Sequence, residues 1–437
     1  MINQEYKQLK EESLINLKGS SIIESYILSL TMPFTILLHY IVFKEKKYEN
    51  NLKNIILNVL CHLFPFIITF TFWTNNYPFF FSLIFLFLIF YIFLNSKRFK
   101  FLTEERLKDL NQKKKFFIST YRISKMLGVC ITILVVDFPK SFDRRLSKCE
   151  SYGISMMDLG VGTFIFSSAM ISTITSRNIT KILKSVGPMI ILGILRWLSI
   201  TVTNYPIHMT EYGTHWNFFF TLASISILIN LIGHSKNDLY LGILAGVLHE
   251  ILLRNGLENY IMNPNRISFV DHNKEGICTL LSYISIYYIA SSFGKLFLKE
   301  RSREEWKNLL IGLWILTILF LIPTLFWEKY FLFSRRLGNF GYILAIVGQN
   351  LILVTLNLTI SMFTEVHDNL MVNIVNSNPL IFFLIANCFT GIINLTFDTL
   401  TIEPPFVFLI LSGYAFAMTF TRLLTLKLTK SETKKKE

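Results

Sequence analysis

Residues 137–162, with the sequence DFPKSFDRRLSKCESYGISMMDLGVG, carry the side chains of this chain that are best suited to chemistry. Before residue 151 the segment holds three acids and four bases, which are Asp137, Asp143, Glu150, Lys140, Arg144, Arg145 and Lys148. It joins two apolar runs in a chain that is 52% hydrophobic, and the second run carries a further acid, Asp158. Charges are costly beside lipid and are kept there when they perform chemistry or bind a charged ligand. This segment is therefore the first candidate for a functional site.

Long apolar runs indicate the elements that must position these residues. The runs are about 18–25 residues long, the length of a helix that crosses the hydrocarbon core of a bilayer. We expect an all-α polytopic membrane protein with about 13 transmembrane helices in a single bundle. The chain would comprise a lumenal segment (1–21), a multi-spanning membrane domain (22–427) and a basic cytosolic tail (428–437). The expected spans are 22–43, 55–74, 77–95, 119–138, 155–175, 185–204, 216–233, 238–254, 276–298, 307–327, 338–362, 379–397 and 405–425.

The distribution of basic residues predicts the orientation of these spans. If the N-terminus is lumenal, the cytosolic connections and the tail collect roughly 25 Lys and Arg, against roughly 13 on the opposite side. The C-terminus is then cytosolic, and the net charge of +14 reflects topology and an anionic leaflet, not nucleic-acid binding. The last four residues, KKKE, resemble a dilysine retrieval signal of the endoplasmic reticulum, with a solvated basic tail as the alternative.

Basic residues expected on the lumenal side run against this trend. They form three groups, which are Arg144, Arg145 and Lys148, then Arg266 and Lys274, then Arg335 and Arg336. Guanidinium groups from several loops could converge on a phosphate-bearing ligand. Interfacial anchoring and pairing with nearby acids would explain the same charges.

Several further polar residues lie in or beside apolar runs. Asp158 and Arg196 are expected to form an ion pair that fastens two helices inside the membrane. His249, which precedes Glu250 in an apolar run, is interpreted as a packed or lumen-facing histidine. The five cysteines lack metal-like spacing, so no metal site is expected, and Cys149 has no histidine nearby in sequence that could activate it as a nucleophile.

Six sequence blocks carry a family resemblance. The block FDRRLSKCESYGISMMDLGVGTFIFSSAM at 142–170 resembles the hallmark of the GPI-anchor inositol acyltransferases, the fungal Gwt and mammalian PIG-W proteins. Further matches follow in the order of that family, namely GSSIIE at 19–24, HMTEYGTHWNFFFTL at 208–222, NKEGI at 273–277, SRRLGN at 334–339 and ANCFTGIINLT at 386–396. Between Asp137 and Lys148 the chain carries one residue more than the family pattern, and Lys274 stands where that pattern has an arginine.

The resemblance implies a multi-pass enzyme of the endoplasmic reticulum membrane. It would transfer a long acyl chain, typically palmitoyl, from acyl-CoA to the inositol 2-hydroxyl of glucosaminyl-phosphatidylinositol during GPI-anchor biosynthesis. Acyl-CoA, the glycolipid and membrane lipid would be its partners, with acyl-CoA as co-substrate and no bound cofactor. A lipid or solute transporter is the main alternative, although no internal repeat is visible. A non-catalytic subunit of the same pathway is the other.

Attack of a hydroxyl on a thioester needs a base and a group that stabilises the oxyanion. Asp137 ends an apolar span, where partial desolvation suits a carboxylate base, and Lys148 would pair with it or hold the oxyanion. Both match family positions that are thought to serve the active site, and a structural ion pair at the interface is the competing interpretation. The expected substrate-positioning residues are Arg144, Arg145, Glu211, His215, Asn217, Arg335 and Arg336.

Overall fold

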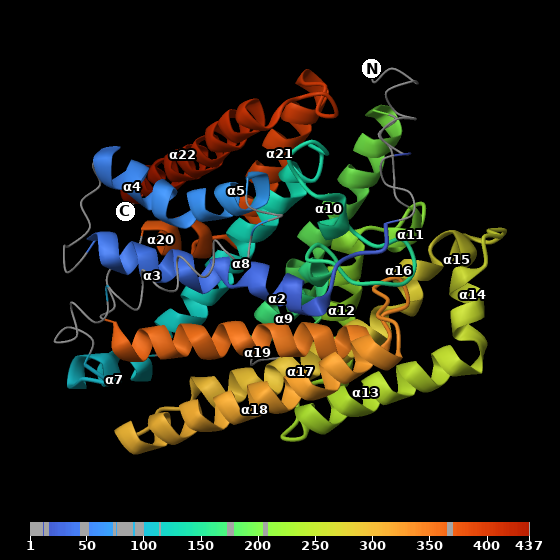
Figure 1. Cartoon of the computed structure of the whole chain (residues 1–437), viewed down its shortest axis with the longest axis horizontal. Helices are drawn as coiled ribbons and strands as arrows, with labels where there is room; N and C mark the ends of the chain where they lie inside the picture. The colour runs from blue at the N-terminus through green and yellow to red at the C-terminus, as the bar shows by residue number, and fades with distance from the viewer. Residues whose placement is uncertain are drawn as a thin grey trace. The chain divides into compact units, whose positions relative to one another are not determined.

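The computed structural model describes residues 17–43, 52–72, 100–112, 115–172, 179–203, 209–364 and 370–436, with single residues 12, 76 and 91. The regular secondary structure of this part of the chain is helical (Figure 1). Its only β-type pairing consists of two isolated bridges, Ser20–Ile154 and Gly153–Ser334. The all-α expectation is therefore confirmed for the described residues.

Eight helices in the described ranges are long and apolar enough to cross a membrane. A ninth span results if the pair Lys53–His62 and Phe64–Thr71, bent by 41°, is counted as one. The multi-span architecture is thus confirmed, whereas the number 13 is not. The eight spans are Ile22–Phe43, Phe116–Val135, Ile182–Val202, Lys274–Leu298, Arg303–Tyr330, Phe340–Phe363, Pro379–Thr396 and Pro404–Leu428.

Of the 13 expected spans, four have no counterpart among the spans that the structure describes, even when the bent pair is counted as the ninth span. The expected span 77–95 lies outside the described residues, apart from residue 91. Helices α9 (Leu159–Ala169) and α12 (Phe218–Ile232) are apolar but shorter than a membrane span. Gly233 ends α12 with a φ of 84°, a conformation that a glycine adopts without strain. Helix α13 (Asp238–Leu252) likewise has only 15 residues.

The chain folds into two compact units, each built from several segments. The first unit contains residues 1–25, 145–299 and 316–351, and the second contains 26–144, 300–315 and 352–437. Three helices continue from one unit into the other, namely α2 (Ile22–Ser29), α18 (Arg303–Tyr330) and α19 (Phe340–Phe363).

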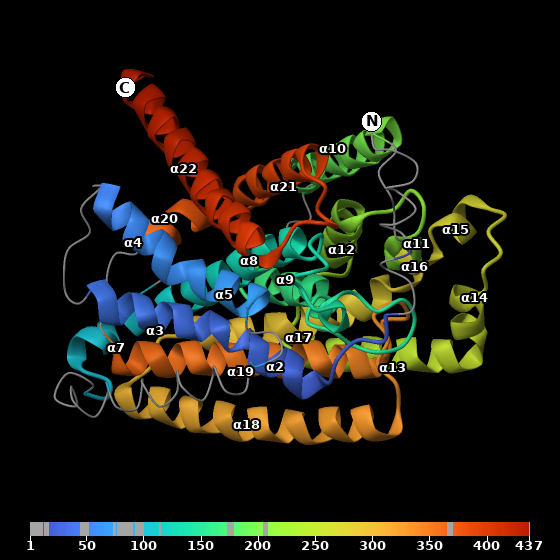
Figure 2. The same cartoon turned by 45° about the horizontal axis from the view of Figure 1, so that its top comes forward.

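Helix α17 (Leu280–Leu298) is the central helix of the first unit. It packs against α9, α12 and α13 (Figure 2). Gly242 of α13 permits close approach, because a Cβ there would lie 2.9 Å from the carbonyl oxygen of Ser285, whose hydroxyl donates to the Gly242 carbonyl at 2.7 Å. Such small-residue contacts are typical of membrane helix pairs. The unit is completed by α10 (Ile179–Thr203), α11 (Met209–Tyr212), η3 (Leu253–Leu257), α14 (Glu258–Met262), α15 (Phe269–His272) and α16 (Lys274–Cys278).

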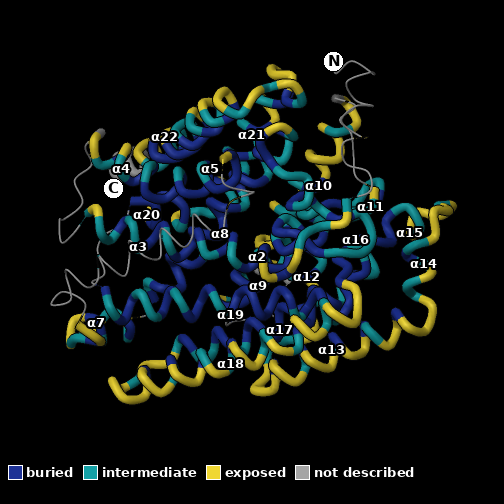
Figure 3. Tube along the Cα trace, in the orientation of Figure 1, coloured by how far each residue is buried: buried dark blue, intermediate teal, exposed yellow. Residues whose placement is uncertain are grey.

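Helix α8 (Phe116–Val135) has the corresponding place in the second unit. It packs against α3 (Thr31–Phe43), α5 (Phe64–Thr71), α20 (Leu370–Asn376), α21 (Pro379–Thr396) and α22 (Pro404–Lys436). Of the apolar window of α8, 83% is buried, whereas α13 and α18 expose many apolar side chains (Figure 3). Those exposed apolar faces suit contact with lipid. Helices α4 (Leu52–His62) and α7 (Glu104–Asn111) and the short η2 (Arg144–Leu146) are the remaining elements.

Candidate functional site

Residues 146–158 of the first unit form a loop that is held from two sides. On one side the Ser20 amide donates to the Ile154 carbonyl at 2.8 Å. On the other side the Ser334 hydroxyl donates to the Ser151 carbonyl at 2.6 Å. Gly153 has a φ of 116°, and a Cβ at this position would collide with the carbonyl oxygen of Lys18. The backbone of the loop is therefore fixed by close contacts that only glycine permits.

Asp158 and Arg335 form a buried ion pair at the base of this loop. The Arg335 Nε lies 2.9 Å from Asp158 Oδ1, and the two side chains are 2% and 0% exposed. The carboxylate also accepts hydrogen bonds from the Ser155 hydroxyl at 2.8 Å and from the Cys149 amide at 3.1 Å. Several donors thus satisfy this carboxylate, which is the condition for a stable buried charge.

The partner of Asp158 corrects the sequence-based expectation. We expected Arg196 of α10 to fasten Asp158, but the structure pairs this carboxylate with Arg335. Arg196 is exposed, and its charge acts on Glu211 instead. The intramembrane pairing was inferred from apolar context, whereas the actual partner lies in a polar loop 177 residues further along the chain.

Lys148 forms an ion pair with Glu211 of α11. Burial would raise the pKa of Glu211, but the positive charges of Lys148 and Arg335 outweigh burial and hold that pKa at about 2. Burial alone would lower the pKa of Arg335, yet the charges of Asp158 and Glu211 raise it above its ordinary value. The Arg335 Nη1 also donates to the Glu211 carbonyl at 3.3 Å. These four residues therefore form one network of alternating charge.

Arg145 is anchored next to this network by an acid of the N-terminal segment. Its Nε lies 2.9 Å from Glu24 Oε1, and the two side chains are 35% and 10% exposed. Glu24 belongs to the block GSSIIE, so the structure gives this block a role in positioning a basic residue of the loop.

Glu275 of α16 gathers the two other groups of basic residues. Its side chain is 0% exposed and accepts from Arg266 Nη2 at 2.5 Å and from Arg336 Nη2 at 3.0 Å. Lys274 is also buried, with its ammonium 5.2 Å from the centre of the Tyr260 ring and 2.5 Å from the Asn263 carbonyl. Arg266, Lys274 and Arg336 thus all have partners within the protein. These contacts agree with the interpretation that the basic residues pair with nearby acids or anchor the structure.

Asn273 joins the segment 213–217 to the start of α16. Its Oδ1 accepts from the amides of His215 and Trp216 at 2.9 and 2.8 Å. The His215 ring stacks on Phe269, with ring centres 6.3 Å apart and 4° between the planes. Asn217 caps α12 by accepting from the Phe219 amide at 3.0 Å. In this structure His215 and Asn217 therefore hold the local backbone, and their contact with substrate stays a prediction.

Asp137 lies in the second unit, just after the end of α8. The Asn394 Nδ2 of α21 donates to its Oδ2 at 2.8 Å. The carboxylate is partly exposed, so it is held in one orientation without being sealed from solvent. Arg144 Nη1 donates to the Val136 carbonyl at 3.0 Å, and burial lowers the pKa of Arg144 while the charge of Asp137 opposes that change.

Cys149 has the features of a structural cysteine. Its side chain is 3% exposed, and burial together with the negative charge of Asp158 raises the pKa of its thiol well above the ordinary value. A reactive cysteine needs the opposite environment, with nearby positive charge and partial exposure. The environment of Cys149 therefore does not suit a nucleophile.

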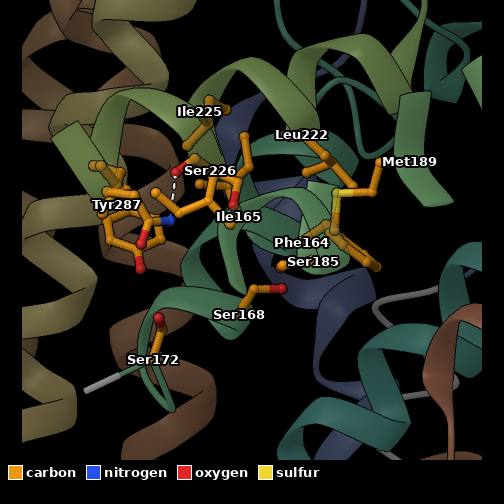
Figure 4. A pocket seen from close by; sticks show the side chains of 13 residues that line it. Phe164, Ile165, Ser168, Ser172, Ser185, Met189, Leu222, Ile225, Ser226 and Tyr287 are labelled. Carbon is orange, nitrogen blue, oxygen red and sulfur yellow. Dashed lines mark hydrogen bonds between the residues drawn. The ribbon is translucent and has the colours of Figure 1, made fainter. Parts of the chain in front are cut away.

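A cavity of about 320 Å³ lies inside the first unit between α9, α10, α12 and α17 (Figure 4). Apolar side chains such as Phe164, Ile165 and Leu222 line it, together with the hydroxyls of Ser168 and Ser185. This volume is at the lower end of the range for small-molecule sites, roughly 300–1,000 Å³. It is large enough for part of an apolar ligand.

Known proteins are similar to this chain over most of its length. The sequence profile of the GWT1 family matches residues 6–425. The chain belongs to the GWT1 family. It is 31% identical to the Phosphatidylinositol-glycan biosynthesis class W protein of Dictyostelium discoideum, over 95% of this chain and 96% of that protein. It is also 29% identical to GPI-anchored wall transfer protein 1 of Candida albicans, over 95% and 97% of the two chains, and 32% identical to the protein of that name in Yarrowia lipolytica, over 71% and 72%.

For this GWT1-family chain, the structure brings together Lys148, Glu211 and Arg335, three of the residues singled out from the sequence. It also reveals residues that sequence reasoning did not single out, above all Asn394 beside Asp137 and Glu275 between two arginines. Both lie in the matching blocks ANCFTGIINLT and NKEGI, so the blocks themselves were the signal that could have found them.

Proposed function

We propose that this chain is an acyltransferase of GPI-anchor biosynthesis in the endoplasmic reticulum membrane. It transfers a long acyl chain, palmitoyl in the first instance, from acyl-CoA to the inositol 2-hydroxyl of glucosaminyl-phosphatidylinositol. Membership of the GWT1 family over residues 6–425 and the names of its relatives support this assignment. The N-terminus is lumenal and the C-terminus cytosolic in this proposal.

The observation that carries the chemistry is the carboxylate of Asp137, oriented by Asn394 at the end of a membrane helix. Asp137 removes the proton of the inositol hydroxyl as its oxygen attacks the thioester carbonyl. An oxygen–carbon bond forms, the carbon–sulfur bond breaks, and the proton passes to the thiolate of CoA. Lys148 stabilises the negative charge that develops on the carbonyl oxygen.

The remaining polar residues position the glycolipid in this proposal. Arg144, Arg145 and Arg335 supply positive charge for its phosphodiester, and Glu211 keeps Lys148 in place. His215, Asn217 and Arg336 form the surroundings of the sugar head group. The apolar cavity of the first unit offers space for part of an acyl chain.

The test is complementation of cells that lack inositol acylation, followed by analysis of the glycolipid intermediates. Restoration of the acylated intermediate supports the proposal, whereas a transporter or a non-catalytic subunit would not restore it. A microsomal assay with labelled palmitoyl-CoA then measures the reaction directly. A glycan on the sequon at Asn178, which lies outside the described residues, would reverse the proposed orientation.

A further inference from the structure

Two basic side chains lie one turn apart inside the membrane-spanning helix α8. Lys125 is 4% exposed and Arg122 is half-buried, within a span of which 83% is buried. Neither side chain makes a hydrogen bond or an ion pair with any residue that the structure describes. The Lys125 ammonium lies 5.9 Å from the centre of the Tyr121 ring. Arg335 and Lys148, in contrast, each contact a carboxylate.

Such a pair is energetically unfavourable without an anion. Residues three apart share a face of a helix, and like charges at this spacing repel each other. Cations within a membrane are costly and, by default, indicate a functional site. No acid of the described chain compensates Arg122 and Lys125, so a ligand with at least two negative charges is the compensation that fits. Arg and Lys side chains are the usual partners of phosphate groups.

A partly open stripe leads along α8 from these cations to Asp137. Val129, Ile133 and Val136 are partly exposed, whereas their neighbours Leu127 and Leu134 are buried. The spacing of these open positions, together with that of Arg122, places them on one face of the helix. Residues on this face therefore connect the cation pair with the proposed base.

The length of the stripe matches a part of the proposed donor. Lys125 and Asp137 are separated by about 18 Å along the helix, at about 1.5 Å per residue. The pantetheine arm of CoA, from its sulfur to its first phosphorus, spans about 16 Å when extended. Lysine side chains in a helix lean toward its N-terminus. With the thioester at Asp137, the Lys125 ammonium therefore lies slightly beyond the far end of the pantetheine arm, where the pyrophosphate would begin.

We propose that Arg122 and Lys125 bind the pyrophosphate of acyl-CoA, with the pantetheine arm along α8 and the thioester near Asp137. This inference rests on the proposed function. It also gives a donor made in the cytosol a route to the lumenal end of α8. The phosphodiester of the glycolipid acceptor has similar chemistry, and the distance along α8 favours the CoA pyrophosphate.

The experiment uses the full chain in detergent or microsomes, with Arg122→Gln, Lys125→Met and the double variant. The KM for palmitoyl-CoA should rise roughly 10–100-fold in each variant, as expected for loss of a charge-assisted contact, while the KM for the acceptor stays unchanged. Lys125→Arg should retain most of the affinity. Binding of free CoA, measured on the Asp137→Asn background to exclude turnover, should weaken in parallel.

Arg422→Gln is the matched control, because Arg422 is also a buried cation of the second unit but donates to the Ser377 hydroxyl at 2.7 Å. Its loss should lower the melting temperature and leave the KM for palmitoyl-CoA unchanged. A rise only in the KM for the acceptor would overturn the inference in favour of the glycolipid phosphodiester. Unchanged CoA binding and KM would assign both cations a structural role. Absence of both transfer and CoA binding in the wild type would instead refute the proposed function.

Discussion

Arg335 and Asp158 lie 2.9 Å apart, almost completely excluded from solvent, and join two loops that are 177 residues apart in sequence. The same guanidinium contacts the Glu211 carbonyl, and Glu211 pairs with Lys148. Lys148, which is proposed to stabilise the oxyanion, is thus held in place by Glu211, and Glu211 in turn contacts the buried pair.

Breaking the Asp158–Arg335 pair should destabilise the fold. Arg335→Ala leaves a buried carboxylate without its countercharge, which costs about 3–5 kcal/mol. The melting temperature of the purified protein should fall strongly. The double variant Asp158→Ala with Arg335→Ala should lose less than the sum of the single losses, and strict additivity would show that the two side chains are not coupled.

Loss of either proposed catalytic group should abolish acyl transfer without preventing membrane insertion. Asp137→Asn removes the base, and Lys148→Ala removes the charge that stabilises the oxyanion, so each rate should fall by about 10²–10⁴-fold. Labelled palmitoyl-CoA in microsomes provides the assay. Lys140→Ala is the control, because Lys140 lies in the same connection but is 44% exposed and pairs with Glu403. Wild-type rates in both catalytic variants would remove the assignment.

Asn394 should act on the reaction by positioning Asp137. Asn394→Asp places a second carboxylate at the hydrogen-bonding position, and this negative charge disfavours ionisation of Asp137. The pH at which kcat is half-maximal should then move upward. Asn394→Leu should lower kcat more than it raises either KM. An unchanged pH profile in the Asp variant would indicate that Asn394 serves only to join α8 and α21.

Gly153 should not tolerate even one additional methyl group. Gly153→Ala forces a side chain into a left-handed conformation and against the Lys18 carbonyl, so the folded yield or the melting temperature should drop. Gly160→Ala is a matched control, since a Cβ there meets nothing within 4 Å. Equal behaviour of the two variants would contradict the described packing of the loop.

The Lys148–Glu211 pair should make stability depend on pH only in the acidic range. The pKa of Glu211 is lowered from an ordinary value of 4.5 to about 2, so its carboxylate stabilises the fold above pH 4.5 and loses this effect as the pH falls toward 2. Glu211→Gln should reduce the dependence of the melting temperature on pH across that interval. Between pH 7 and 5 the slope of the variant should match that of the wild type.

The helices were predictable because a membrane span is a continuous apolar run, which is visible locally in the sequence. The short helices α12 and α13 were harder to predict, since their ends depend on single residues such as Gly233. Asp137 and Lys148 stood out because charges beside apolar runs are rare. The partners of Asp158 and of Arg336 could not be inferred, because contacts between distant loops leave no periodic pattern in the sequence.

The loop that carries Lys148 is held by a hydrogen bond from the Ser334 hydroxyl to the Ser151 carbonyl. These two residues are 183 positions apart in the sequence. A ribosome that adds roughly 5–20 residues per second needs roughly 10–40 s to travel that far. At the end of this interval the segments from α9 to α17 have been synthesised, whereas Ser334 and Arg335 are only then added. Chains that end before residue 334 should therefore lack the completed loop even when they are correctly inserted, so the proposed activity arises only late in synthesis.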